Sequence, residues 1–264
     1  NFIKPHPPNV CCDPYHRIYV DAAFPEAVRR VEEIEAPHPY WGFHWQHLGE
    51  PALTNERHRR EYAAAYYGMI NEVDDNLGLL FQALKDSGQW NDTLIIFTSD
   101  HGEYLGDHYL TGKGHFYDGA LHIPSIVRDP SPEADATRGC HLDHLVESVD
   151  VAPTILEWSD TPIPDRVQGR SLLPALRGEK YVIKTEVFHE YDYRQGVLRV
   201  DRSADPDQHL AWVVRDKTYK YVQFANSEMP PLLFDLEADP SELHNLAADA
   251  SYVPTVAAYC QKLL

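Results

Sequence analysis

The chain has 264 residues, of which 43% are hydrophobic and 11% aromatic, so it can bury a substantial core and is not expected to be disordered. Its 41 acidic and 23 basic side chains give a formal charge of -18, which argues against nucleic acid or an anionic membrane as the main partner. A small anionic substrate fits this charge only if a metal or a few cationic side chains make one cleft locally positive.

The four cysteines are too few for a disulfide framework and lack the paired spacing of a metal site, so we expect free thiols. The sequence shows no export signal and no apolar stretch long enough to span a bilayer, which favours a cytoplasmic location. Because the chain does not begin with Met, a targeting segment outside it stays open.

The first 51 residues are rich in Pro, His and aromatic residues, and they predict an extended loop region with a helical period only at residues 26–34. A long helix is expected from Thr54, a plausible N-cap, to Gly88. The short apolar run at residues 93–98 is typical of a strand that is covered on both faces of a parallel sheet.

A second buried strand is expected at residues 123–127, followed by a helix that begins near Asp150 and ends near Trp158. These elements predict an α/β core over residues 1–178. Beyond Gly178, residues 179–264 predict a small α+β subdomain. Its expected parts are strands at 184–189, 210–215 and 218–224, with a turn at Asp216-Lys217, and a last helix at 251–263.

Asp100 and His101 follow directly after the expected strand at 93–98, where open α/β sheets bind their ligands. One oxygen and one nitrogen donor suit Mn, Zn or Fe better than Ca, which prefers oxygen alone. In a purely structural alternative, Asp100 caps the next turn and His101 lies at the surface. Spacing alone favours this alternative and the metal site about equally.

Two other local patterns have a chemical interpretation. Lys113 lies between two glycines, where a backbone can approach a ligand closely, and a desolvated lysine there could pair with a sulfuryl or phosphoryl oxygen. His6 lies in a proline-rich extended segment that could present it as a general acid. Taken alone, each pattern is more often just a surface loop.

Together these segments resemble one family, the sulfatases of the alkaline phosphatase superfamily, and most closely the phosphonate monoester hydrolase and arylsulfatase branch. The resemblance covers nearly the whole chain and matches the C-terminal half of the family. The matching runs are residues 67–78 (Tyr-Gly-Met-Ile-Asn-Glu-Val-Asp-Asp-Asn-Leu-Gly), 91–93, 98–103 (Thr-Ser-Asp-His-Gly-Glu), 112–114, 122–124, 4–8, 191–194, 231–236 and 242–246.

The resemblance implies a sulfatase-like sheet with flanking helices, here incomplete, and hydrolysis of sulfate, phosphonate or phosphate esters. It implies that Asp100 and His101 share one divalent metal with ligands from an N-terminal part. Many arylsulfatases have Asn at the position of His101 and use Ca, so His101 favours Mn or Zn, with Ca as the alternative. By the same resemblance Lys113 contacts the substrate anion and His6 lies near the leaving group. The implied partners are a small anionic ester and, in the full-length form, further copies of the protein.

The chain departs from the family because it lacks the Cys/Ser-x-Pro-x-Arg motif, whose cysteine the family oxidises to formylglycine as the nucleophile. The stretch from Cys12 to Arg17 imitates this motif but has His16 in place of the arginine and follows residues 4–8, where the family has an ordinary loop, so we reject it. Two alternatives stay open: a truncated, non-catalytic remnant with only a structural role, and another superfamily member with a Ser or Thr nucleophile.

The same resemblance leaves three other features without a role. His108 and His115 flank the lysine loop, and a structural role is expected for each. Residues 191–194 (Tyr-Asp-Tyr-Arg) are compatible with a substrate rim or with an oligomer contact.

Overall fold

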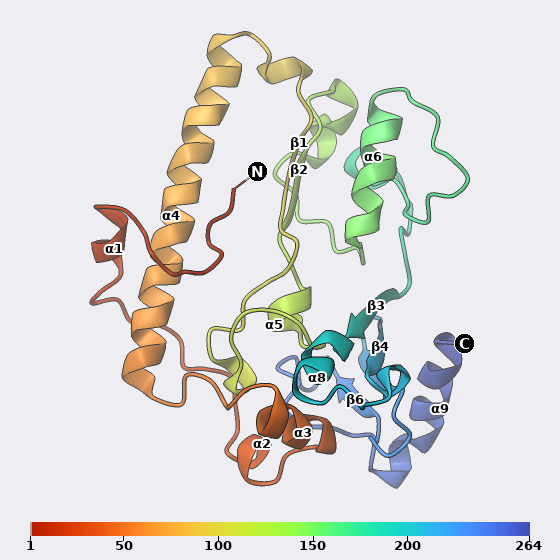
Figure 1. Ribbon diagram of the computed structural model, residues 1–264. Coiled ribbons are helices and arrows are strands. Elements are labelled where there is room, and N and C mark those ends of the chain that lie inside the picture. The colour runs from red at the N-terminus through yellow and green to blue at the C-terminus, as the bar shows by residue number, and fades with distance from the viewer. Residues whose placement is uncertain (1) are drawn as a thin grey trace. The chain divides into compact units, whose positions relative to one another are not determined.

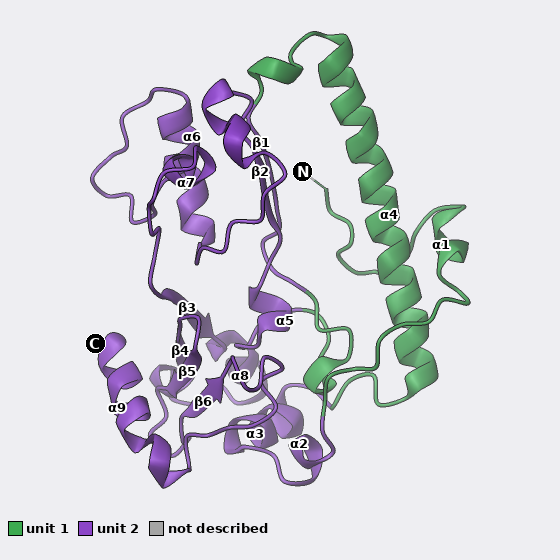
Figure 2. Ribbon diagram, turned by 180° about the vertical axis from the view of Figure 1, so that it is seen from behind, with its two compact units in different colours: residues 1–29, 51–93, 103–112 green, residues 30–50, 94–102, 113–264 purple. Residues whose placement is uncertain are grey.

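The structure, a computed structural model, describes residues 2–264 and divides them into two compact units (Figure 2). The first unit consists of residues up to 29, 51–93 and 103–112, and the second of residues 30–50, 94–102 and 113–264. The expected boundary at residue 178 stays a prediction. Among the helices formed by residues 2–264, none is both long and apolar enough to cross a membrane.

The first unit is built on the long helix α4 (Glu56–Asp86), with the short helix α1 (Tyr15–Ile18) beside it (Figure 1). The helix begins one residue later than Thr54 would place it, because the side chain of Asn55 accepts hydrogen bonds from the first backbone N–H groups. Gly68 lets the two helices approach closely, since a Cβ there would lie 2.6 Å from the carbonyl oxygen of Tyr15.

The second unit contains both sheets and the remaining α-helices (Figure 1). Its elements are α2 (Glu32–Glu35), α3 (Pro39–His47), β1 (Ile95–Thr98), α5 (Asp118–Leu121), β2 (Ser125–Arg128), α6 (Val151–Trp158), α7 (Leu173–Leu176), β3 (Val187–Asp192), α8 (Arg194–Val200), β4 (Leu210–Arg215), β5 (Tyr219–Phe224), β6 (Leu232–Asp235) and α9 (Val253–Lys262).

Helix α3 was not expected, because its segment is dense in aromatic residues and has no clear amphipathic period. Pro39 occupies the first turn, and the His38 ring accepts a hydrogen bond from the backbone N–H of Tyr40. Tyr40 and Trp41 are buried. Tertiary packing of these rings therefore stabilises a helix that the sequence pattern does not predict.

Strands β1 and β2 confirm the two expected short strands of the core, but their pairing differs from the expectation. They pair antiparallel, with Ile96 opposite Val127, and within residues 2–264 β1 has no other strand neighbour. The expectation of a parallel sheet was wrong for this pair, because an apolar run indicates burial and carries no information about strand direction. The strands are also only partly covered, since Ile126 is 64% exposed.

The C-terminal part folds as an antiparallel sheet in the order β3-β4-β5-β6, which confirms the expected hairpin and the last helix. Side chains alternate between its two faces. One face packs against α9 through Val214, Tyr221, Leu233 and Tyr259. By the same alternation, His189, Tyr191, Arg215 and Lys220 lie on the opposite face. Residues of the candidate site, described below, pack against this opposite face of the sheet.

Candidate active site

Asp100 and His101 lie directly beyond β1, which ends at Thr98. The two side chains face each other, with His101 Nε2 3.5 Å from Asp100 Oδ2. The Asp100 side chain is 82% exposed and that of His101 is 26% exposed. A carboxylate oxygen and an imidazole nitrogen are thus available side by side at the end of a strand.

The turn that carries this pair is fixed by its own backbone. Gly102 donates its N–H to the carbonyl of Ala120 at 2.8 Å, and a Cβ at Gly102 would collide with the carbonyl oxygen of Gly119. The hydroxyl of Ser99 donates to the carbonyl of His101 at 2.7 Å. Because only glycine permits this approach, the turn is held tightly against α5.

The orientation of the His101 ring suits a metal ligand. Its Nδ1 lies 2.8 Å from the carbonyl oxygen of Gly102, a hydrogen bond that requires the proton on Nδ1. Nε2, the nitrogen nearest Asp100, then keeps its lone pair. In metal-binding histidines, a hydrogen bond from the ring nitrogen that does not bind the metal commonly fixes the tautomer. The donor pair therefore fits a divalent cation that accepts both oxygen and nitrogen.

Asp100 is ionised more readily than an ordinary aspartate. Burial opposes its ionisation, but His101, backbone hydrogen bonds and Lys113 together outweigh burial and lower the pKa of Asp100. The carboxylate is therefore a charged donor at neutral pH.

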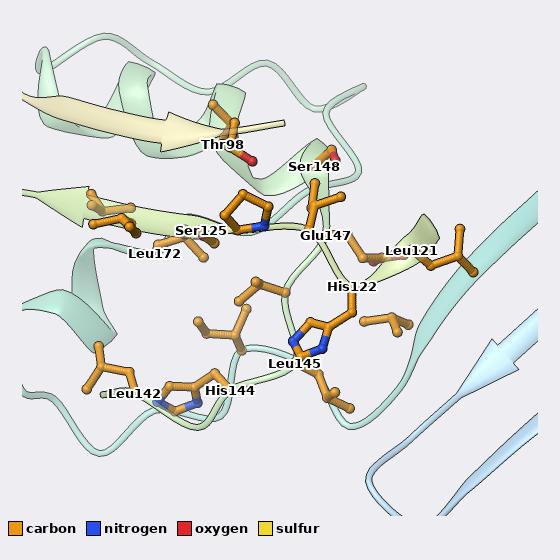
Figure 3. A pocket seen from close by; sticks show the side chains of 18 of the residues that line it. Thr98, Leu121, His122, Ser125, Leu142, His144, Leu145, Glu147, Ser148 and Leu172 are labelled. Atoms are coloured by element: carbon orange, nitrogen blue, oxygen red, sulfur yellow. The ribbon is translucent and has the colours of Figure 1, made fainter. Parts of the chain in front are cut away.

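Asp100, His101 and Lys113 all line one cavity of about 1570 Å³ in the second unit. Figure 3 shows other parts of its wall, with side chains such as Thr98 and His122 around the space. The structure therefore brings together three of the four expected site residues. Within the described residues, however, no group of three or more His, Cys, Asp or Glu side chains is arranged to hold a metal. The pair supplies two donors only.

The loop that carries Lys113 depends on both of its glycines. Gly112 and Gly114 have φ values of +71° and +97°, in the left-handed region that side chains with a Cβ rarely adopt. A Cβ at Gly112 would meet nothing within 4 Å, whereas one at Gly114 would lie 2.9 Å from the Tyr191 hydroxyl. Lys113 is exposed between them.

A buried ion network fixes the residues that follow this loop. Lys220, fully buried, pairs with Asp118 and lies 2.5 Å from Glu242 Oε1, and it also donates to the carbonyl of Phe116 at 3.1 Å. Arg215 lies 3.2 Å from the other oxygen of Asp118. The sequence patterns do not predict these contacts, because Asp118 and Lys220 lie 102 positions apart and leave no local signal.

The pKa values of the two carboxyl groups in this network shift in opposite directions. Burial opposes ionisation of Asp118, yet Lys220 and Arg215 outweigh it and lower the pKa of Asp118. Burial raises the pKa of Glu242 although Lys220 opposes this. Asp118 is the ionised anchor of the segment.

The cavity is not lined by His6, Cys12, His108 or His115. His6 and Cys12 belong to the first unit and are exposed, with His6 Nδ1 2.6 Å from the carbonyl oxygen of Pro7. His108 is buried in the same unit. His115, in the second unit, is buried with its Nδ1 2.6 Å from the hydroxyl of Tyr40. The four cysteines all have free thiols, as expected.

Two family models match the chain. The Sulfatase model matches residues 2–161, and the model named N-sulphoglucosamine sulphohydrolase, C-terminal, matches residues 106–264. The chain therefore belongs to the sulfatase family, as the sequence resemblance indicated.

Individual relatives and solved structures show which members of the family the chain is similar to. The chain is 39% identical, along its whole length, to the multifunctional alkaline phosphatase superfamily protein PehA of Trinickia caryophylli, and 28% identical to an arylsulfatase of Clostridium perfringens. Among solved structures it is similar to phosphonate monoester hydrolases of Agrobacterium radiobacter (TM-score 0.89, 36% identity) and Silicibacter pomeroyi (TM-score 0.85, 33% identity), each over 99% of this chain.

The chain spans about half the length of these relatives. It covers 54% of PehA, 51% of the arylsulfatase and 54% of each phosphonate monoester hydrolase. Their shared fold confirms the sulfatase-like mixture of helices and sheets that the sequence predicts.

Proposed function

We propose that the protein containing this chain hydrolyses sulfate, phosphonate or phosphate esters, and that the cavity of the second unit is part of its active site. The observation that carries the proposal is the convergence of Asp100, His101 and Lys113 on one cavity. Family membership supports the reaction class, since the relatives carry the names of sulfatases and phosphonate monoester hydrolases. A small anionic ester is the substrate that one exposed lysine and a metal site would suit.

In this proposal Asp100 and His101 would hold a divalent metal, Mn or Zn in preference to Ca because one donor is nitrogen. A bound divalent cation would supply Lewis-acid stabilisation of negative charge on the substrate. Asp100 provides a full negative charge, and the carbonyl of Gly102 fixes the ring of His101. The remaining ligands would come from residues outside this chain, as the family resemblance implies.

Lys113 would bind the anionic oxygens of the substrate. Its ammonium group is a compact, mobile point charge, suited to an anion without a fixed planar geometry. His6 would donate a proton to the leaving group, and a formylglycine nucleophile would come from outside residues 1–264; both roles follow from the resemblance alone.

The first test removes the two charges in the full-length protein. We expect Asp100→Asn to lower metal content and turnover together, and Lys113→Ala to lower kcat/KM by roughly 100-fold or more, as loss of a charge-stabilising group does elsewhere. Metal content is measured by elemental analysis, and turnover in parallel with an aryl sulfate, a phosphodiester and a phosphonate monoester.

Matched controls are available outside the cavity. Lys180→Ala and Asp165→Asn remove the same charges from exposed positions that do not line it. Both should retain wild-type turnover and metal content. Unchanged turnover in Asp100→Asn or Lys113→Ala would rule out the assigned role.

A further inference from the structure

Tyr191, on β3, packs against the loop that carries Lys113. Its ring and hydroxyl lie close to the position that a Cβ at Gly114 would take, with three of their atoms within 3.2 Å of it. Its ring centroid is 5.2 Å from that of His115. Tyr191 therefore touches both residues that follow Lys113.

Two side chains of β3 also hydrogen-bond to the loop backbone. The hydroxyl of Tyr191 and the ring of His189 each form a hydrogen bond with the backbone of His115. His189 and Tyr191 are two positions apart on one strand, so they project from the same face of the sheet. One face of β3 is thus hydrogen-bonded to the backbone of His115 through two side chains.

The Lys113 loop needs such a support. Its two glycines permit the left-handed turn, but glycine also has the greatest conformational freedom to lose on ordering. Lys113 itself is exposed and its long side chain is flexible. A lysine that must meet an anion in one position therefore depends on contacts at its neighbours.

We propose that Tyr191 is a positioning residue, which acts on turnover by holding the backbone of residues 114 and 115 and so placing Lys113 in the cavity. This inference rests on the proposed function of Lys113. Tyr191 also lines the cavity, but its hydroxyl is used on the loop backbone and its ring packs against Gly114, so the proposed role differs from a substrate rim and from an oligomer contact.

The test is a double-mutant cycle in the full-length protein with Tyr191→Phe and Lys113→Ala. Tyr191→Phe keeps the ring and removes the hydroxyl, and we expect a loss of roughly fivefold to tenfold in kcat/KM, the size of one net hydrogen bond. In the Lys113→Ala background the same change should cause no further loss. Equal losses in both backgrounds would overturn the inference and leave the proposed function standing.

A Lys113→Ala variant with wild-type turnover gives a different result, because it rejects the proposed function and the inference with it. Tyr221→Phe is the matched control. Its hydroxyl, 2.5 Å from Gln223 Oε1, lies on the other face of the same sheet, so turnover should not change.

A second measurement does not depend on activity. Hydrogen exchange of residues 112–118 should be faster in Tyr191→Phe than in the wild type, and unchanged in Tyr221→Phe. His189→Asn, which removes the other contact to His115, should lower turnover only when Lys113 is present. Unaltered exchange of the loop in Tyr191→Phe would contradict the positioning role.

Discussion

His115 is a buried histidine beside the lysine loop that stays neutral well into the acid range. Burial, with a smaller effect of His44, lowers the pKa of His115 from 6.5 to about 3. The ring lies among Tyr40, Tyr191 and Trp41. In the folded protein it is therefore an uncharged packing residue, which agrees with the structural role expected for it.

The low pKa makes His115 a source of acid sensitivity. The unfolded chain protonates this histidine near pH 6.5, whereas the folded chain does so only near pH 3. Its contribution to stability is thus complete above pH 6.5 and is lost as the pH falls towards 3, by at most about 1.4 kcal/mol per pH unit. We expect the stability difference between the wild type and His115→Gln to shrink as the pH is lowered through this range.

Urea denaturation at several pH values between 7 and 4 measures this difference. His58→Gln is the control, because His58 is exposed on α4 and should leave the pH dependence as it is. Parallel pH curves for the wild type and His115→Gln would show that His115 does not cause the acid sensitivity.

At the scale of elements, the residues that follow Lys113 pack against strand β3. This contact is centred on Gly114 and lies within the second unit. Both Gly112→Ala and Gly114→Ala place a Cβ at positive φ, which costs about 1–2 kcal/mol. Only the second also meets the Tyr191 ring. We expect Gly114→Ala to lower the melting temperature more than Gly112→Ala, and to lower turnover as well. Equal melting temperatures would mean that the ring yields without cost.

Sequence patterns predicted the elements that have strong local signals. The helix over residues 56–86, the hairpin of β4 and β5 and the helix α6 follow from apolar spacing, capping and turn residues. Helix α3 and the direction of β1 against β2 did not follow, because both depend on tertiary packing.

The candidate site shows the same division. Asp100 and His101 were predicted because they follow a strand, and the resemblance implied Lys113 and His6; the roles of all four stay predictions. The contacts that hold the site were not predicted, since Tyr191, Lys220 and Glu242 reach it from distant parts of the chain. Long-range partners of this kind have no spacing that one sequence can reveal.

At the scale of the whole molecule, the proposed metal site leads to a prediction for the 264-residue chain by itself. With two donors instead of the four or more of a stable site, the 264-residue chain should bind Mn²⁺ or Zn²⁺ only weakly. Calorimetric titration should show no stoichiometric complex at micromolar protein, and Asp100→Asn should change little. Tight binding that Asp100→Asn abolishes would show that the chain holds a complete site.

The buried Lys220 of β5 has a consequence for substitutions at the positions that it contacts. Lys220 neutralises carboxylates from two separate segments, Asp118 after the lysine loop and Glu242 after β6. Loss of this one cation would leave Glu242 in the interior without its cationic partner, where an uncompensated charge is costly, and would leave Asp118 with Arg215 alone. A loop exchanged between relatives is therefore expected to lose stability in a host without the matching lysine, so the effects of substitutions at these three positions should be coupled.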